Sequence, residues 1–270
     1  MWTDELRVSD EVSAAAWIAA KLGGEFGAVT LAVPSGYPAY VRICHPATDR
    51  GDAPVSWPEV AKATGRRAHA LMQWHQLVGS PNPRDPSGSL WQGGEPETGN
   101  LAPEVLGPLC DLLAKHTADP ARCFFCVWEG WGWVDGSRVL AHIVLRRGNA
   151  AVPSAQTEEP VPPAFSPEQL GRARVRLPGR DYLLLEGPLS AATKIGYWAT
   201  PTWFLHQSPN LFWPADRAWC AATEIDFDST LVGGSAQLIQ TILDTPTFDA
   251  WKVGPEDSLA YDADKINATA

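Results

Sequence analysis

Strand-like and helix-like segments alternate irregularly along this chain, and this order restricts its fold more than any other feature. Apolar β-rich runs and helical patterns are interspersed without a strict βαβ period and without an internal repeat. The sequence therefore predicts an α+β fold with a mixed, largely antiparallel sheet, peripheral helices and long loops rich in Pro and Gly. We expect a single domain over residues 1–270; the alternative is a subdivision into 1–148 and 168–270 around a Pro-rich loop at 149–167.

The periodicity of the apolar residues assigns the individual elements. Helical patterns cover residues 10–22, 56–65, 67–77, 103–116 and 235–243, with a helical turn at 189–195. Strand patterns cover 27–33, 37–45, 122–129, 138–146, 181–186 and 219–227. The first two strands flank a Pro-Ser-Gly turn and are expected to form a hairpin, as are 122–129 and 138–146. Long loops are expected at 79–100 and, with many aromatic residues, at 197–214.

The overall charge and the cysteines indicate a compartment and exclude some partners. The formal net charge is −10, so the long-range field repels phosphate backbones and anionic membranes. We therefore expect neither nucleic-acid nor membrane binding. No apolar run is long enough to span a bilayer, and acidic residues stand where a signal peptide carries basic ones. Together with an odd number of cysteines, five, this favours a cytoplasmic protein with reduced thiols.

Cys123-Phe-Phe-Cys126 has the spacing of a redox pair or of half a zinc site. The pair lies inside an apolar, strand-like run, where alternation would place the two side chains on opposite faces of a sheet. A zinc site would need two further ligands, and the sequence holds no second CxxC pair. Buried core thiols are the favoured interpretation, with metal binding by Cys123 and Cys126 as the alternative, and no cofactor is expected.

Residues 225–232 read Ile-Asp-Phe-Asp-Ser-Thr-Leu-Val and resemble the first motif of haloacid dehalogenase-type phosphatases. The resemblance implies that Asp226 is a nucleophile, that Asp228 is a general acid/base and that both carboxylates bind Mg²⁺. This motif normally begins its domain, so its position here would require a circular permutation. Two solvent-exposed acids after a strand are the interpretation that we favour.

Thirteen Trp residues are unusual, and several cluster near residues 197–219. Clustered Trp can form a stacking platform for a ligand, although it can also pack beneath loops as additional core. Polar side chains accompany this cluster and complete the candidate binding set, which is Trp198, Trp203, His206, Trp213, Asp216 and Arg217. His206 could also form an acid/base pair with Asp216, Glu224, Asp226 or Asp228.

Several strings along the chain, among them Cys-Phe-Phe-Cys-Val-Trp-Glu-Gly at 123–130 and Gln-Ser-Pro-Asn-Leu at 207–211, resemble a family of bacterial proteins without an assigned activity. The resemblance implies that the Asp-x-Asp-x-Thr string belongs to that family's own pattern, and it implies no ligand. We therefore expect a non-catalytic binding protein whose Trp-rich loop meets a protein or a small molecule. The alternative is a metal-dependent hydrolase or transferase acting on a phosphorylated or sugar-like substrate, with Glu224, Asp226, Asp228 and His206 as its catalytic candidates.

Overall fold

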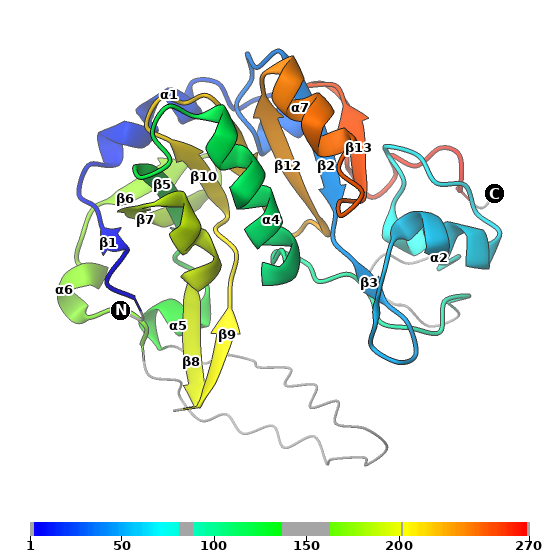
Figure 1. The fold of residues 1–270 in the computed structure, drawn as a ribbon, viewed down its shortest axis with the longest axis horizontal. Coiled ribbons are helices and arrows are strands. Elements are labelled where there is room, and N and C mark those ends of the chain that lie inside the picture. Colours follow the sequence, from blue (N-terminus) through cyan, green and yellow to red (C-terminus); the bar gives the residue numbers. More distant parts are fainter. Residues whose placement is uncertain (1–2, 81–88, 137–162, 201, 269–270) are drawn as a thin grey trace.

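A computed structural model describes residues 3–80, 89–136, 163–200 and 202–268 (Figure 1). The strand expected at 138–146 lies outside the described residues. Among those described, no helix has both the length and the apolar character needed to cross a bilayer.

A nine-stranded sheet forms the centre of the fold, and each of its described pairings is antiparallel (Figure 1). Its order is β1 (Arg7–Val8), β7 (Arg180–Gly187), β5 (Cys123–Trp128), β10 (Leu211–Pro214), β11 (Cys220–Ala222), β12 (Ser229–Gly234), β2 (Ala39–Cys44) and β13 (Ala250–Val253), with β6 (Arg174–Leu177) also paired to β7. Two hairpins stand outside it, β3 (Ala47–Thr48) with β4 (Pro54–Val55) and β8 (Gly196–Thr200) with β9 (Trp203–His206). The expected α+β fold with a largely antiparallel sheet is confirmed.

Strands from both sides of residues 149–167 share this sheet. β5 lies between β7 and β10, and β2 lies between β12 and β13. Neither 1–148 nor 168–270 can therefore complete the sheet without hydrogen bonds from the other.

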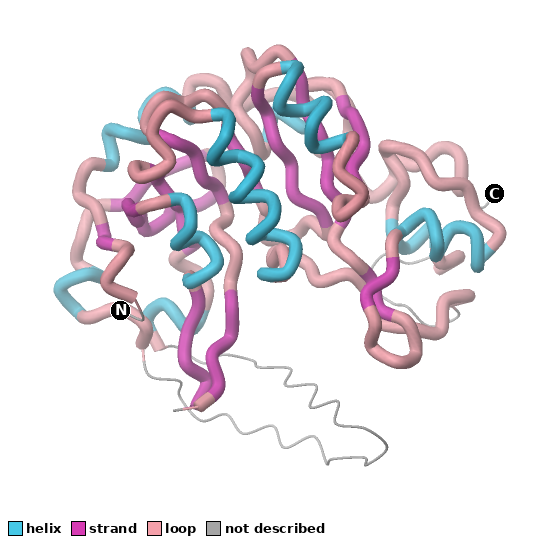
Figure 2. Tube along the Cα trace, in the orientation of Figure 1, coloured by secondary structure: helices cyan, strands magenta, loops and turns pink. Residues whose placement is uncertain are grey.

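The sheet buries both of its faces. Along β5, Cys123, Phe125 and Val127 belong to one apolar cluster, while Phe124 and Cys126 belong to the other. The first face is covered by α4 (Pro103–Leu113), α7 (Ala236–Leu243) and the 3₁₀ turn η4 (Leu189–Lys194); the second packs against η1 (Val12–Ala15), α1 (Ala16–Ala19) and η2 (Val29–Leu31) (Figures 1 and 2). Period-two alternation thus lets one strand supply two cores.

A smaller apolar cluster lies beside the sheet, around α2 (Trp57–Thr64) and α3 (Trp74–Leu77). Ser56 precedes α2, and its backbone N–H donates to Glu59 Oε2 over 3.0 Å; Gly65 ends the helix with φ of 70°. The remaining short helical elements are η3 (Ala114–His116), α5 (Gly132–Asp135) and α6 (Pro167–Leu170).

The helices expected at 56–65, 103–116 and 235–243 are confirmed, as are the turn at 189–195 and the strands within 37–45, 122–129 and 181–186. The expected hairpin at 27–45 is wrong. Val29 and Thr30 donate their backbone N–H groups to the carbonyls of Asp257 and Pro255, so the C-terminal segment replaces a neighbouring strand, and 27–33 contains only η2.

Four further expectations are also wrong or too long. Only the end of 67–77 is helical, because the carbonyls of Ala70 and Met72 accept hydrogen bonds from Arg42 on β2. The helix at 10–22 is reduced to η1 and α1. The aromatic segment 197–214 is not a loop but forms β8, β9 and β10, as its Trp, Phe and Tyr content favours. The strand at 219–227 is limited to β11.

Candidate functional site

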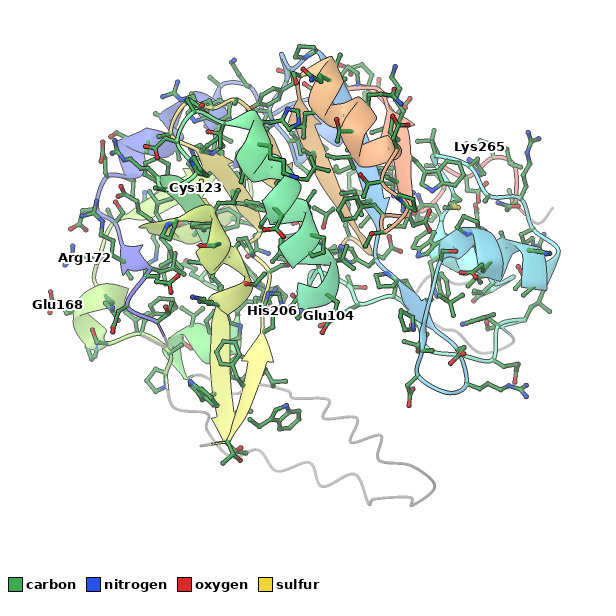
Figure 3. The ribbon with its side chains drawn as sticks, viewed as in Figure 1. Glu104, Cys123, Glu168, Arg172, His206 and Lys265 are labelled. Atoms are coloured by element: carbon green, nitrogen blue, oxygen red, sulfur yellow. The ribbon has the colours of Figure 1, made fainter. Side chains whose placement is uncertain are left out.

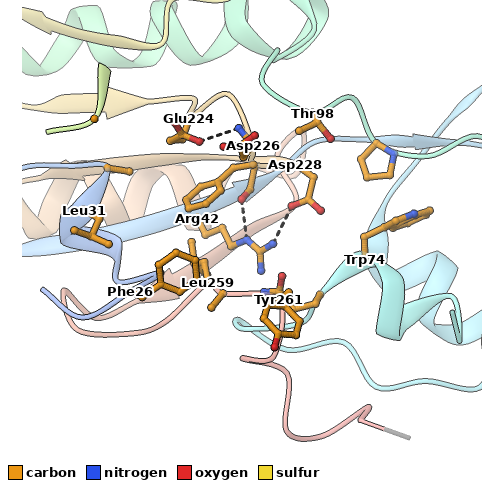
Figure 4. Close-up of a pocket in the computed structure, with 18 of the residues that line it drawn as sticks. Phe26, Leu31, Arg42, Trp74, Thr98, Glu224, Asp226, Asp228, Leu259 and Tyr261 are labelled. Atoms are coloured by element: carbon orange, nitrogen blue, oxygen red, sulfur yellow. Dashed lines mark hydrogen bonds and ion pairs between the residues drawn. The ribbon is translucent and has the colours of Figure 1, made fainter. Parts of the chain in front are cut away.

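The three acidic catalytic candidates lie together in the turn that joins the antiparallel strands β11 and β12. Glu224, Asp226 and Asp228 line a cleft of about 1020 Å³, which we call the acidic-turn cleft (Figure 4). It is also lined by Arg42, Arg180 and His75, whereas His206 lines a different groove. The structure therefore separates the proposed histidine from its proposed acids.

Each of these carboxylates is already engaged by an arginine. Arg180 Nε lies 2.8 Å from Glu224 Oε1, and its Nη2 lies 2.7 Å from Asp226 Oδ2. Asp228 pairs with the buried Arg42 over 3.2 Å (Figure 4). Asp226 and Asp228 thus form ion pairs with different guanidinium groups. Carboxylates engaged in this way do not fit the ligand set of a shared Mg²⁺ ion.

Thr230, the last residue of the Asp-x-Asp-x-Thr string, is buried and forms hydrogen bonds inside the fold. Its hydroxyl is 3.0 Å from His45 Nε2 and 2.7 Å from the hydroxyl of Thr223. The other His45 nitrogen, Nδ1, is 2.6 Å from the backbone oxygen of Glu97, and burial lowers the pKa of this imidazole. The string therefore contributes to a buried hydrogen-bond network on β2 and β12.

Cys123 and Cys126 lie on opposite faces of β5, as strand alternation predicts. Burial raises the pKa of both thiols, that of Cys123 to about 12. Among the described residues, no group of three or more His, Cys, Asp or Glu side chains is arranged to hold a metal ion. Both cysteines act as small core side chains.

Three members of the expected binding set, Trp213, Asp216 and Arg217, make structural contacts in the fold. Trp213 is buried in the second core face, where it stacks on Phe124 with ring centroids 5.7 Å apart. Asp216 accepts a hydrogen bond from the backbone of Ala118 over 2.8 Å and so joins two loops. Arg217 adopts φ of 57°, and its guanidinium lies 5.3 Å from the Trp17 ring centre. These contacts give all three a structural role.

A second and larger concave surface, of about 1550 Å³, is lined by Trp203 and His206; we call it the hairpin groove. The β8–β9 hairpin, α5, the start of α4 and the segment that contains β3 and β4 contribute to its lining. Its aromatic side chains are Trp131, Trp133, Tyr197, Trp203 and Phe248. The exposed Trp198 lies on the same hairpin but packs against Phe204, with centroids 5.4 Å apart, and does not line the groove.

Aromatic contacts fix the walls of the hairpin groove. Trp133 of α5 stacks on Tyr197 of β8 with centroids 5.5 Å apart and an interplanar angle of 8°. Trp131 donates its indole N–H to Asn210 Oδ1 over 3.2 Å, while Trp203 keeps 36% of its surface exposed. The groove therefore combines anchored rings with one ring that is free to contact a ligand.

His206, the last residue of β9, brings an unused polar group to this groove. Both ring nitrogens are shielded from solvent, and neither has a hydrogen-bond partner in the part of the chain that the structure describes. Desolvation lowers the pKa of His206 to about 4, and no carboxylate contributes to the shift. The imidazole is therefore neutral near pH 7 and offers one donor and one acceptor.

Two polar residues of the groove were not expected from the sequence. Asn100 donates its amide to Glu97 Oε1 over 2.8 Å and to the backbone oxygen of His206 over 3.2 Å. Burial raises the pKa of Glu97. Both residues lie in the segment 79–100, whose sequence shows only its loop composition and carries no signal that would have identified them.

Comparisons with protein-family models, with curated proteins and with solved structures find no match for this chain.

Proposed function

We propose that this protein is a non-catalytic, cytoplasmic binding protein and that its ligand is a small organic molecule with a flat ring, held in the hairpin groove. The observation that carries the proposal is the imidazole of His206. Leaving a shielded polar group without a partner destabilises a protein by about 1–3 kcal/mol. A ligand that hydrogen-bonds to His206 would remove this penalty on binding.

The lining of the groove supports a small ligand rather than a protein surface. Small-molecule sites are concave and mostly apolar, with a few polar groups that fix orientation. The hairpin groove has this composition, with Trp131, Trp133 and Trp203 beside His206 and Asn100. In contrast, the acids of the hydrolase or transferase alternative are held by Arg42 and Arg180.

The proposed compartment and the exclusion of nucleic acid have their own support. Each of the five cysteines is a buried free thiol, as is usual in a reducing compartment. The net charge of −10 disfavours phosphate backbones as partners.

The proposal is tested with a panel of planar aromatic fragments and saturation-transfer NMR on the full chain. We expect fragments to bind the wild-type protein and to bind His206→Leu about tenfold more weakly, the effect of losing about 1.4 kcal/mol. Trp203→Ala is expected to weaken binding as well. Phe26→Ser is the control, because the exposed Phe26 lines only the acidic-turn cleft.

Unfolding curves of all variants establish that they are folded before binding is compared. If no fragment binds, or if His206→Leu and Trp203→Ala bind as tightly as Phe26→Ser, the hairpin groove is not the binding site.

A further inference from the structure

The charge of the hairpin groove differs from that of the acidic-turn cleft. Its lining includes the carboxylates of Glu95, Glu97, Glu104 and Asp249 and, among the described residues, no Lys or Arg. The acidic-turn cleft balances its carboxylates with Arg42 and Arg180. We infer that the hairpin groove selects a ring-bearing organic cation, such as a protonated aromatic amine; this inference rests on the proposed function.

Two of these carboxylates accept hydrogen bonds from neutral donors. Glu97 accepts from the amide of Asn100 over 2.8 Å. Asp249 accepts from the backbone N–H of Trp57 over 2.8 Å and from the indole of Trp251 over 2.7 Å. These neutral donors hold the two side chains in place and add no positive charge to the groove.

Glu104 adds a charge where the groove meets α4. It lies in the first turn of that helix and is exposed, and it lines the same groove as His206 (Figure 3). Asn100, three residues before α4 begins, links the two sides by its hydrogen bond to the His206 backbone. The same groove is therefore lined by a carboxylate and by the neutral imidazole.

The chemistry of the walls agrees with a cationic ligand. An ammonium group is attracted to the face of a Trp or Tyr ring, by about 0.5–2 kcal/mol depending on its exposure. The neutral imidazole of His206 can accept a hydrogen bond from an ammonium N–H. A carboxylate or phosphate ligand would instead meet carboxylates and, among the described lining residues, no arginine to hold it.

Three probes with the same ring and different charges test the inference: 2-phenylethylamine, 2-phenylethanol and phenylacetate. Their dissociation constants for the full chain are measured by ligand-observed NMR at neutral pH and low salt. We expect the amine to bind at least about tenfold more tightly than the alcohol, and phenylacetate to bind most weakly.

Charge variants assign the preference to named side chains. Glu97→Gln and Glu104→Gln are expected to reduce the advantage of the amine over the alcohol severalfold. Glu256→Gln removes the same charge from an exposed position outside both concave surfaces and should keep the full preference.

The outcomes separate this inference from the proposed function. Equal binding of amine and alcohol, or no binding of the amine, overturns the selection of a cation. If neutral fragments still bind and His206→Leu weakens their binding, the proposed function stands and only the selection of a cation is lost. An undiminished preference for the amine in both groove variants also overturns the inference.

Discussion

Trp133 lies face to face with Tyr197, with the two ring centroids 5.5 Å apart and the ring planes within 8° of each other. Trp133 belongs to α5 and Tyr197 to β8, so this stack attaches the β8–β9 hairpin to the segment that follows β5. His206 lies at the same end of this hairpin, where it pairs with Gly196 beside Tyr197, so its position depends on this attachment.

We expect Tyr197→Leu to reduce the free energy of unfolding by about 1 kcal/mol beyond its change in buried area, the usual contribution of an aromatic pair. Tyr197→Phe retains the ring and should keep most of this stability. Urea unfolding at neutral pH measures both. Equal stability of the two variants would contradict a structural role for the stack.

The two ion pairs of the Asp-x-Asp-x-Thr string should contribute differently to the free energy of unfolding. Arg42 is buried, and it bonds to Asp228, to Ser229 Oγ over 3.0 Å and to the carbonyl of Met72 over 2.7 Å. We expect Arg42→Met to destabilise the protein by about 3–5 kcal/mol, because buried partners are left unpaired. Asp226→Asn, at a largely exposed ion pair, should cost about 1 kcal/mol or less. Chemical denaturation compares them, and a reversed order would exclude this account.

The lowered pKa of His206 makes stability depend on pH. Its ordinary value is 6.5 and its value in the fold is about 4, so between these values the unfolded chain binds more protons than the native protein. Stability is therefore fully present above pH 6.5 and decreases as the pH falls to about 4, by on the order of 3 kcal/mol.

His206→Leu should flatten this part of the stability curve. His45 and His75, whose pKa values burial also lowers, keep their own contributions in the variant. Urea unfolding at a series of pH values measures the slope. An unchanged slope in the variant would mean that His206 is solvated in solution.

The five cysteines provide a simple test of the core. Each is buried, and burial raises the pKa of each thiol, so little thiolate forms at neutral pH. We expect no reaction of the native protein with a thiol-specific disulfide reagent within minutes, and reaction of five thiols after unfolding in urea. Rapid reaction of one thiol in the native protein would show that its surroundings open.

Local patterns predicted the elements that depend on local chemistry. The Pro-led apolar stripe of α4, the serine cap of α7 and the continuous apolar run of β5 are all visible in a few neighbouring residues. Residues 27–33 were assigned wrongly because their backbone partners lie at 255–259. No local pattern contains that information.

The residues of the candidate site also divide into those that the local sequence identifies and those that only the fold identifies. Trp203 and His206 were identified from composition, and both line the hairpin groove. Trp213 was wrongly included with them. Its burial follows from the neighbouring strands β5 and β11, which the local sequence does not identify. Glu97 and Asn100 become relevant only when the fold brings their loop to β9.

The order of strands in the main sheet also determines when the protein can fold during its synthesis. Among the described strands, β2 pairs with β12 and β13, and the hydrogen bond from Arg42 to Ser229 spans 187 positions. While the ribosome adds those positions, both edges of an apolar strand remain unpaired. The nascent chain therefore passes through a long interval in which β2 can pair with other chains, and chaperone binding at this strand would protect it until β13 emerges.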